Sequence, residues 1–188
     1  MKRSISKKLI MAPMPVLIIV TYDENNVPNA MNAAWGMQCD FDAITISLAP
    51  HKTTKNLKIK KAFTLSFATK ETVAESDYFG IETGDYINKI EKAGFHVQKS
   101  ERVDAPIITE YPLTLECEMI ELADDEGDYR LTGKVINVLA DENVLDENGN
   151  LNFDKLHLIS YDSSSKVYRE VGSVVGHAFH DGLKIKNK

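Results

Sequence analysis

Residues 113–140 constrain the fold of this chain more than any other stretch. Apolar and polar side chains alternate in the first half, where the apolar ones are Leu113, Leu115, Cys117 and Met119. The sequence DDEGD follows, and a second extended segment returns from Tyr129 to Ala140. Alternation with a period of two is typical of a strand, and an Asp- and Gly-rich break is typical of a turn. These residues therefore predict a long antiparallel hairpin.

Shorter strands are predicted on either side of this hairpin. Val16–Tyr22 and Ala30–Trp35 flank the turn residues DENNVPN, which indicates another hairpin. The stretches 42–50 and 62–69 each alternate in hydropathy, which predicts two further strands. Residues 156–172 suggest two short strands around a serine turn.

Two stretches predict helices. Residues 52–61 begin with the hydroxyl-rich sequence KTT, which can cap a short helix, and Leu57 supplies its apolar contact. Residues 71–95 carry apolar side chains at three- and four-residue spacings, which predicts helix there. Gly84 and Gly94 stand at plausible helix ends.

Strands that follow strands favour an antiparallel barrel over a parallel sheet. We expect six to eight strands and two or three helices, arranged as a mainly β, Greek-key-like barrel with helical decoration. Strands and helices do not alternate regularly, and no glycine-rich dinucleotide fingerprint follows the first strand, which argues against a Rossmann domain. With 188 residues and no obvious linker, the chain is expected to form a single domain over residues 1–188.

The charge and hydropathy of the chain limit its partners. A net charge of −6 argues against a nucleic-acid surface built on bulk positive potential. The basic start MKRSISKK and the apolar stretch after it imitate a signal peptide, but Pro13 and Pro15 would break its helix. No run of about 18 apolar residues predicts a membrane span, so we expect no membrane partner and a cytoplasmic location.

The cysteines and histidines do not indicate a metal or disulfide site. Cys39 and Cys117 are too few for a disulfide framework or a four-thiolate metal site, and we interpret them as reduced, buried thiols. His177 and His180 are three residues apart, but no carboxylate–histidine motif surrounds them, which favours a solvated pair.

A segment rich in small residues, PNAMNAAWG at residues 28–36, suggests a surface for a planar ligand. Small side chains allow a flat group to approach the backbone closely, with amides and an indole beside it. Taken by itself, Trp35 is more often a core or interface aromatic residue. Asn29 is interpreted as a turn residue, whereas Asn32 lies further inside the strand and is the better ligand candidate.

A second segment, SLAPHKTTKNL at residues 47–57, groups the donors that a phosphate requires. Hydroxyl, imidazole, ammonium and amide groups occur together where a strand ends and a helix is predicted to begin. Unpaired backbone N–H groups and the helix dipole favour an anion at such a position. The alternative is a helix cap at Thr53 or Thr54 followed by a solvated lysine face. The sequence shows no local signature of a Ser–His–Asp or Cys–His–Asn catalytic triad, so no catalytic residue is assigned.

Together these segments resemble the flavin reductase-like family, whose members bind FMN on a split β-barrel, and the flavoredoxin branch in particular. The resemblance covers nearly the full chain and includes the N-x-M-x-A-x-W-like strand within PNAMNAAWG. It continues through DAITISLAPHKTTKNLKIKKAFTLSFAT, GDYINKIEKAGF, APIITEYPLTLECEM and the hairpin after it, and KVYREVG. Each motif is weakly specific by itself, and their common order carries the resemblance.

The resemblance implies a set of FMN-binding positions and no metal ligand. The family places the isoalloxazine ring along one strand, the ring's polar edge and ribityl chain at a neighbouring strand end, the phosphate in a turn, and a further strand beside the flavin. In that order, the matching residues are Asn32, Ala33, Ala34 and Trp35; Ser47, Leu48 and Ala49; His51, Lys52, Thr53 and Asn56; and Ser66 and Phe67. Many relatives have Arg or Lys with Ser where this chain has His51-Lys52-Thr53, so the individual phosphate contacts stay open.

The function implied by the resemblance is that of an FMN-containing oxidoreductase. NADH or NADPH is the expected reductant, and no ribose-reading motif in this sequence selects one of them. Members of the family are typically homodimers with the flavin near the subunit interface, and an electron-acceptor protein is a further candidate partner. Two alternatives stay open: an electron-carrier flavoprotein that a partner reduces, and a split-barrel relative that binds heme.

Overall fold

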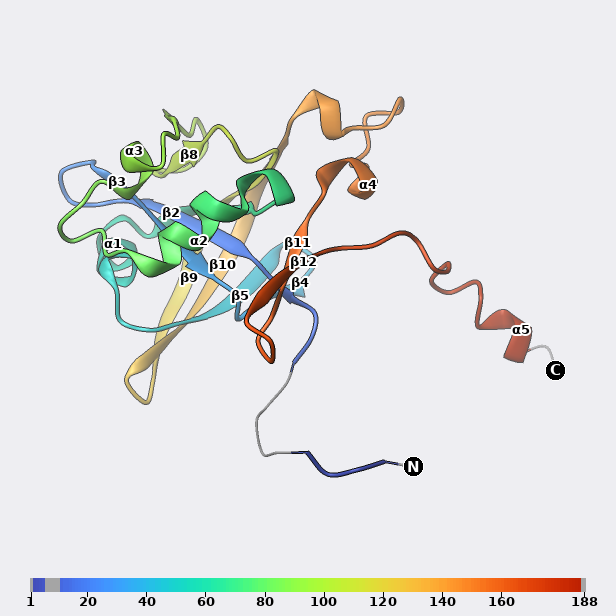
Figure 1. Ribbon diagram of the computed structural model, residues 1–188. Coiled ribbons are helices and arrows are strands. Elements are labelled where there is room, and N and C mark those ends of the chain that lie inside the picture. The colour runs from blue at the N-terminus through green and yellow to red at the C-terminus, as the bar shows by residue number, and fades with distance from the viewer. Residues whose placement is uncertain (1, 6–10, 187–188) are drawn as a thin grey trace.

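A seven-stranded antiparallel sheet forms the body of the protein (Figure 1). The computed structural model describes residues 2–5 and 11–186. Residues 6–10 fall outside this description, and with them part of the stretch that imitates a signal peptide. Neighbouring strands follow the order β3 (Pro28–Ala33), β2 (Leu17–Tyr22), β6 (Ala62–Phe67), β9 (Leu113–Asp125), β10 (Asp128–Ala140), β5 (Ala43–Leu48) and β4 (Gly36–Asp40).

The long hairpin predicted over residues 113–140 is confirmed, and it forms the middle of the sheet. β9 and β10 pair from Asp128 opposite Asp125 to Ala140 opposite Leu113. Two register shifts interrupt this pairing, and bulges of this kind bend a strand and increase its twist. The expected class, a mainly antiparallel split barrel with a few helices, is confirmed.

Two hydrophobic clusters, one on each face of the sheet, hold the fold together. β2 contributes to both, because its successive side chains point to opposite faces. The inner cluster, inside the barrel, includes Leu17, Ile19, Ile46, Leu57, Phe63, Leu65 and Leu131. The outer cluster includes Ile18, Val20, Phe79, Ile90 and Ile108.

The predicted alternation of β6 is confirmed, although both faces of this central strand are buried. Its hydroxyl side chains Thr64 and Ser66 are fully buried and hydrogen-bonded. Thr64 donates to the carbonyl oxygen of Pro106 at 2.6 Å, and the hydroxyls of Ser66 and Thr114 share a hydrogen bond of 2.8 Å. A buried hydroxyl without a partner costs about 1–3 kcal/mol, so these bonds allow polar side chains to lie inside the fold.

Helix α1 (Lys52–Lys60) confirms the short helix predicted at residues 52–61, and it closes one end of the barrel interior. Leu57 is fully buried and belongs to the inner cluster. The side chain of Asn56 donates to the hydroxyl of Thr21 on β2 at 3.0 Å, which joins the helix to the sheet.

The helical prediction over residues 71–95 is confirmed only in part. Helices α2 (Val73–Ile81) and α3 (Lys89–Lys92) lie over the outer cluster, but residues 82–88 between them form a loop (Figure 1). The apolar spacing continues through this loop. Gly84 packs against β3 there, so tertiary contact outweighs helix propensity.

Two small sheets complete the fold. The two short strands predicted in residues 156–172 are confirmed, and they pair with each other around a serine-rich turn. The smaller sheets contain β1 (Met14–Pro15), β11 (Ile159–Asp162) and β12 (Val167–Glu170) in one case, and β7 (Val97–Lys99) and β8 (Pro106–Ile108) in the other. The remaining short helices are η1 (Lys70–Thr72), η2 (Glu142–Val144), α4 (Phe153–Leu156) and α5 (Leu183–Lys186).

The two cysteines lie in different environments, and the prediction that both are buried is wrong for Cys39. This residue is exposed on β4, because β4 is an edge strand with no neighbour on one side. Cys117 on β9 is fully buried, and burial raises the pKa of its thiol to about 12, with a smaller contribution from the carboxylate of Glu116. Only Cys39 therefore presents an accessible thiol.

Neither a metal cluster nor a membrane helix is found within residues 2–5 and 11–186. No three His, Cys, Asp or Glu side chains in this part of the chain are grouped so that they could ligate a metal ion. No helix there combines the length and the apolar character that crossing a bilayer requires.

The substitution Gly133→Ala should destabilise the fold. The added Cβ would lie 2.5 Å from Cζ and 2.9 Å from Cε1 of the fully buried Phe63 ring. Overpacking a core costs about 1–3 kcal/mol, and denaturant unfolding would measure this loss. Gly172→Ala, where a Cβ meets no atom within 4 Å, is the control and should leave stability unchanged. Equal stabilities for the two variants would contradict tight packing at Phe63.

Candidate functional site

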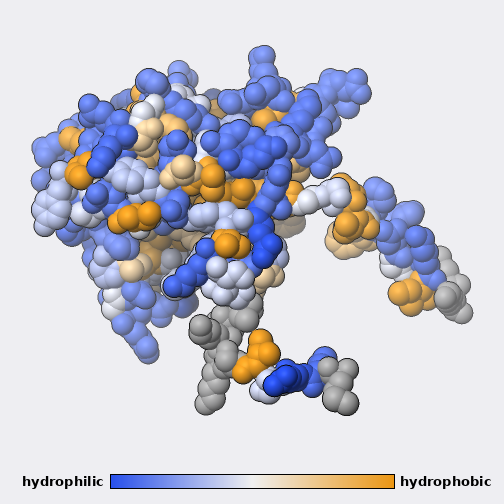
Figure 2. All heavy atoms as spheres, viewed as in Figure 1, coloured by the Kyte–Doolittle hydropathy of each residue, from blue (hydrophilic) through white to orange (hydrophobic). Residues whose placement is uncertain are grey.

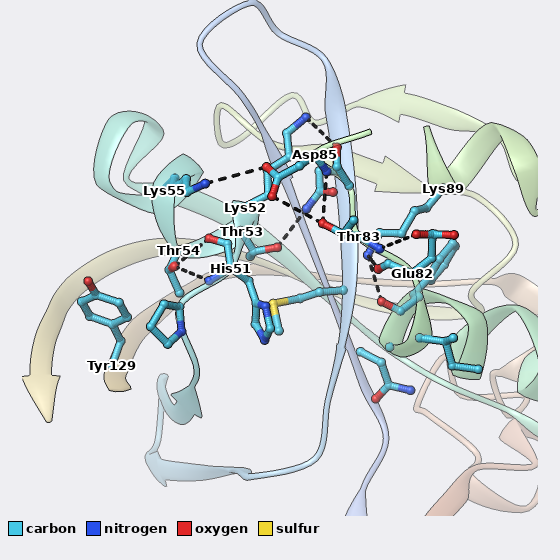
Figure 3. A pocket seen from close by; sticks show the side chains of 18 of the residues that line it. His51, Lys52, Thr53, Thr54, Lys55, Glu82, Thr83, Asp85, Lys89 and Tyr129 are labelled. Atoms are coloured by element: carbon cyan, nitrogen blue, oxygen red, sulfur yellow. Dashed lines mark hydrogen bonds and ion pairs between the residues drawn. The ribbon is translucent and has the colours of Figure 1, made fainter. Parts of the chain in front are cut away.

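A polar pocket of about 510 Å³ lies where β3, the start of α1 and the end of α2 meet (Figure 3). We call it the α1 pocket. The loop of residues 82–85 forms one wall, and Tyr129 of β10 contributes a further part of its lining. Its charged and hydroxyl-bearing lining residues are His51, Lys52, Thr53, Thr54, Lys55, Lys58, Glu82, Thr83, Asp85, Lys89 and Tyr129.

The N-terminus of α1 opens into the α1 pocket. His51 is the N-cap residue, and its backbone N–H donates to the hydroxyl of Thr54 at 3.0 Å. That hydroxyl in turn donates to the carbonyl oxygen of His51 at 2.8 Å, which holds the first turn in shape. The first N–H groups of a helix have no intrahelical partner, and the first turn of α1 contains no acidic residue. This end of the pocket therefore favours an anion.

Asn29 connects β3 to the start of α1. Its side-chain amide donates to the hydroxyl of Thr53 at 2.9 Å, and both residues are buried. The interpretation of Asn29 as a turn residue is therefore wrong, because the residue lies within β3 and makes a tertiary hydrogen bond. Asn29 is one of the pocket residues that sequence reasoning missed.

Gly84 brings the loop of residues 82–85 against this connection. A Cβ at Gly84 would lie 1.8 Å from Oδ1 of Asn29, so only glycine allows the approach. The ammonium of Lys52 donates to the carbonyl oxygen of Gly84 at 3.1 Å and lies 3.4 Å from the carboxylate of Asp23. Lys52 therefore fastens the loop to α1 while it lines the pocket.

Lys89 is a second pocket cation, and sequence reasoning missed it as well. It is buried, and its ammonium donates to the carbonyl oxygens of Phe79 at 2.9 Å and Glu82 at 3.0 Å. Burial lowers the pKa of Lys89 to about 8; the carboxylates of Glu82 and Asp85 oppose this shift, and the nearby charge of Lys52 adds to it. The sequence signal was the first of the two lysines in GDYINKIEKAGF, which by itself does not reveal burial.

Lysines and carboxylates are unevenly distributed around the α1 pocket (Figure 3). Lys55 lies 3.8 Å from the carboxylate of Asp85, and this pair is solvent-exposed and therefore weak. Lys58 donates to the hydroxyl of Tyr129 at 2.8 Å. With Lys52 and Lys89 added, four lysines stand against the two lining carboxylates and Asp23, which pairs with Lys52, so a smaller positive excess remains among the described residues.

A second hollow, of about 410 Å³, adjoins the α1 pocket and shares the lining residues Asn32, Gly80 and Ile81 with it. We call it the Trp35 hollow. Trp35 is 67% exposed where β3 gives way to β4, and the N–H of Ser47 donates to its carbonyl oxygen at 2.8 Å. The other residues that line the Trp35 hollow include Ala33, Ala34, Asp77, Tyr161, Lys166 and Tyr168.

Asn32 holds the boundary between the two cavities in place. Its side-chain amide donates to the carbonyl oxygen of Ser76 on α2 at 2.8 Å. A Cβ at Gly80 would lie 3.3 Å from Cβ of Asn32, so glycine allows α2 to approach β3 closely. Nearby, the hydroxyl of Tyr168 donates to the carboxylate of Asp77 at 2.7 Å, and burial followed by this carboxylate raises the pKa of Tyr168.

The structure brings together seven of the residues expected from sequence. Those that line the α1 pocket or the Trp35 hollow are Asn32, Ala33, Ala34, Trp35, His51, Lys52 and Thr53. The Trp35 hollow is lined by Ala33–Trp35, and the α1 pocket is lined by His51–Thr53. Asn32 lines both cavities.

The other six expected residues line neither cavity. Leu48 belongs to the inner cluster, and the side chains of Asn56 and Ser66 are buried and bonded to Thr21 and Thr114. Ser47, Ala49 and Phe67 complete this group. The backbone N–H of Ser47 still contacts the edge of the Trp35 hollow, because it donates to the carbonyl oxygen of Trp35.

Comparison with known proteins gives a consistent family relationship. The family model described as "Flavin reductase like domain" matches residues 11–164. The solved structure of flavoredoxin from Desulfovibrio vulgaris (Miyazaki F) is 29% identical, with 97% of this chain and 100% of that chain covered and a TM-score of 0.92. The flavoredoxin structure from Methanosarcina acetivorans is 23% identical, with 98% and 99% covered and a TM-score of 0.89.

The curated relatives match a smaller share of this chain. An uncharacterized protein of Aquifex aeolicus (strain VF5) is 28% identical over 103 residues, which cover 55% of this chain and 53% of that protein. The chain spans about half the length of the curated relatives that it matches.

Lys89→Met should change how stability depends on pH. The pKa of Lys89 is 10.5 in the unfolded chain and about 8 in the folded protein. Between these two pH values the unfolded state therefore binds more protons than the folded state. The contribution of Lys89 to the free energy of unfolding therefore rises with pH across this window. The difference in unfolding free energy between wild type and Lys89→Met should rise there, as measured by denaturant unfolding at a series of pH values. A flat difference for Lys89→Met would contradict burial of the ammonium.

Proposed function

Because this chain belongs to the flavin reductase like domain family, we propose that it is an FMN-binding oxidoreductase whose cofactor occupies the α1 pocket and the Trp35 hollow. The observation that carries the proposal is the shared boundary of the two cavities. The α1 pocket has the charge and donors that an anion requires, and the Trp35 hollow has small side chains beside an indole. A flavin mononucleotide has the matching parts, a phosphate and a planar ring system.

The phosphate is assigned to the start of α1. The backbone N–H groups of the first turn, the hydroxyl of Thr53 and the ammonium of Lys52 are the proposed donors. His51 lies at the same end and is a further candidate contact. A doubly charged group here would also offset the positive excess of the pocket.

The ring is assigned to the Trp35 hollow. Ala33 and Ala34 add little bulk to its wall, and Asn32 stands at the boundary with an amide held in place by α2. We assign no ligand contact to the side chains of Leu48, Asn56 and Ser66, because each is buried against other parts of the fold. The cavity volume of about 510 Å³ for the α1 pocket lies within the usual range of about 300–1,000 Å³ for cofactor sites.

When bound, flavin supplies hydride- and electron-transfer chemistry, and the protein's task is to bind it, orient it and limit access of water. The chain's own residues have correspondingly simple roles. Lys52 and Thr53 bind the phosphate end of the flavin, and Asn32 contacts it at the boundary between the two cavities. No side chain is assigned to proton transfer. The proposed reductant is NADH or NADPH. A second candidate, an electron carrier that a partner protein reduces, is favoured by the similarity to the Desulfovibrio flavoredoxin.

We further propose that the chain is one flavin-binding domain over residues 1–188, works in the cytoplasm and assembles as a homodimer. Trp35 and Ile81 support the homodimer, because they are 67% and 76% exposed at the Trp35 hollow, and a second copy would cover such apolar side chains.

Lys52→Met should weaken binding of FMN without weakening binding of riboflavin, which lacks the phosphate. Loss of a hydrogen bond to a charged group costs about 1.5–3 kcal/mol, so the FMN dissociation constant should rise by about tenfold to a hundredfold. Trp35 is the chain's only tryptophan, and quenching of its fluorescence reports binding of either compound. Titration with FAD in parallel establishes which flavin binds more tightly.

Lys70→Met is the control, because Lys70 lines neither cavity and its ammonium contacts the exposed side chains of Glu71, His157 and Glu170. It should bind FMN as the wild type does. Equal losses of FMN and riboflavin affinity in Lys52→Met would mean that Lys52 supports the loop at Gly84 and does not contact a phosphate. Failure of the wild type to bind any flavin would overturn the proposed function.

Rapid anaerobic mixing separates the reductase from the electron carrier. The FMN-loaded protein is mixed with NADH or with NADPH, and the flavin absorbance is followed. Bleaching within seconds by one of the two nucleotides is the expected result, and the faster nucleotide is the preferred reductant. A loaded protein that stays oxidised with both would support the electron carrier.

A further inference from the structure

The last described part of the chain, residues 171–186, leaves the body of the protein as an extended arm (Figure 1). We call it the C-terminal arm. The N–H of Val171 donates to the carbonyl oxygen of Leu158 at 2.8 Å, which fixes the point of departure. Among the described residues, no hydrogen bond or ion pair joins residues 172–186 to the rest of the protein. The family model ends at residue 164, before the arm begins.

The arm nevertheless has a defined local shape. The carboxylate of Asp181 accepts from the N–H of His177 at 2.9 Å, and Gly176 leaves room for it, since a Cβ there would lie 2.8 Å from Oδ2. Phe179 has a φ of 60°, a left-handed conformation that is costly for an aromatic residue. Strained positions of this kind persist where neighbouring structure holds them in place. No residue in the described body of this chain does so for Phe179, which is fully exposed.

Apolar side chains repeat along the arm at intervals of four residues: Val171, Val175, Phe179 and Leu183. Residues four apart lie on the same face of both an extended segment and a helix. All four are exposed, Val175 at 100% and Phe179 at 101%. Figure 2 shows hydrophobic side chains along the arm, set apart from the body. The arm therefore presents an apolar edge that no described part of its own chain covers.

The barrel has a complementary unfilled surface, an apolar groove of about 470 Å³. We call it the barrel groove. Its floor includes Leu17, Ile46, Leu65 and Leu115 of the inner sheet face, and its rim includes Met37, Phe41, Val138 and Phe153, all exposed. Asp42 is the one charged residue in its lining, as far as the chain is described, whereas the arm carries Lys184 and Lys186. The two surfaces thus match in hydropathy and in charge.

We propose that the C-terminal arm binds in the barrel groove of a second copy of this chain, and that two copies exchange arms reciprocally. A two-fold exchange covers both unpartnered surfaces of each copy and leaves no open end for further assembly. Each copy offers 16 arm residues and 18 groove residues, enough for the roughly 20–30 residues per side of a standard interface. The inference rests on the homodimer proposed above and does not depend on the bound cofactor.

The partner is a second copy because of the direction in which the arm runs. From Val171 the arm extends away from the barrel, and its end lies far from its own body (Figure 1). Its anchor Leu158 itself lines the barrel groove, so the arm leaves from the edge of its own groove and runs away from the body instead of into that groove (Figure 1). A second copy, facing the first, receives the arm in the direction it already takes.

The double substitution Val175→Asp and Phe179→Asp tests the arm in the full chain. Both side chains are exposed, so the change spares the fold, and sedimentation velocity over a concentration series should show the dimer dissociation constant raised about tenfold or more. The matched control is Ile59→Asp, an exposed apolar residue on α1 outside the groove, which should leave the dimer intact. A monomeric wild type, or a dimer that the arm variant does not weaken, would overturn the proposal.

Cross-linking identifies whose groove the arm occupies. Two differently tagged chains, both carrying Cys39→Ser, are mixed, one with Phe179→Cys and the other with Phe153→Cys, and treated with a short bis-maleimide. A cross-link between the two tags is expected, and none is expected when Ile59→Cys replaces Phe153→Cys. A cross-link formed only within a single chain that carries both cysteines, or equal cross-linking to position 59, would refute the exchange. The two experiments measure the mass of the assembly and the tags joined by the cross-link. Their outcomes are therefore independent of flavin binding.

Discussion

The buried hydrogen bond from Asn29 to Thr53 is the contact on which the candidate site depends. It joins the edge strand β3 to the first turn of α1, and so sets the helix N-terminus beside the strand that carries the small residues. Gly84 then packs against Asn29, and Lys52 holds the loop there. Without this connection the anion-favouring end and the small-residue end would have no fixed separation, and one ligand could not contact both.

Several polar side chains inside the barrel and on α1 are hydrogen-bonded to other parts of the fold and do not face the candidate site. Thr64 and Ser66 lie inside the fold with hydrogen-bond partners, and the side chain of Asn56 ties α1 to β2. The lysines of the α1 pocket are different. Among the described residues, Lys89 is held by two carbonyl oxygens and no carboxylate is bonded to its ammonium, which leaves capacity for one more acceptor. The stable part of the fold and the part able to bind an anion are thus separate.

Sequence reasoning predicted those parts of the fold that depend on local pattern. The hairpin of β9 and β10, the strands β5 and β6 and helix α1 follow from alternation, spacing and turn residues, which act over a few neighbouring positions. The break at residues 82–88 could not be predicted in this way, because it results from Gly84 meeting a side chain 55 positions earlier in the chain. Cys39 was expected to be buried, and its exposure follows from the position of β4 at the sheet edge.

The sequence by itself determined the class of the fold, the family and the two segments that provide the candidate ligand groups, because composition and residue order carry that information. Only the tertiary structure decided which of those groups face a common space. Asn56 and Ser66 turn into the fold, whereas Asn29 and Lys89 turn towards the pocket. The physical reason is that the direction of a side chain depends on what packs against it, and those neighbours come from distant parts of the chain.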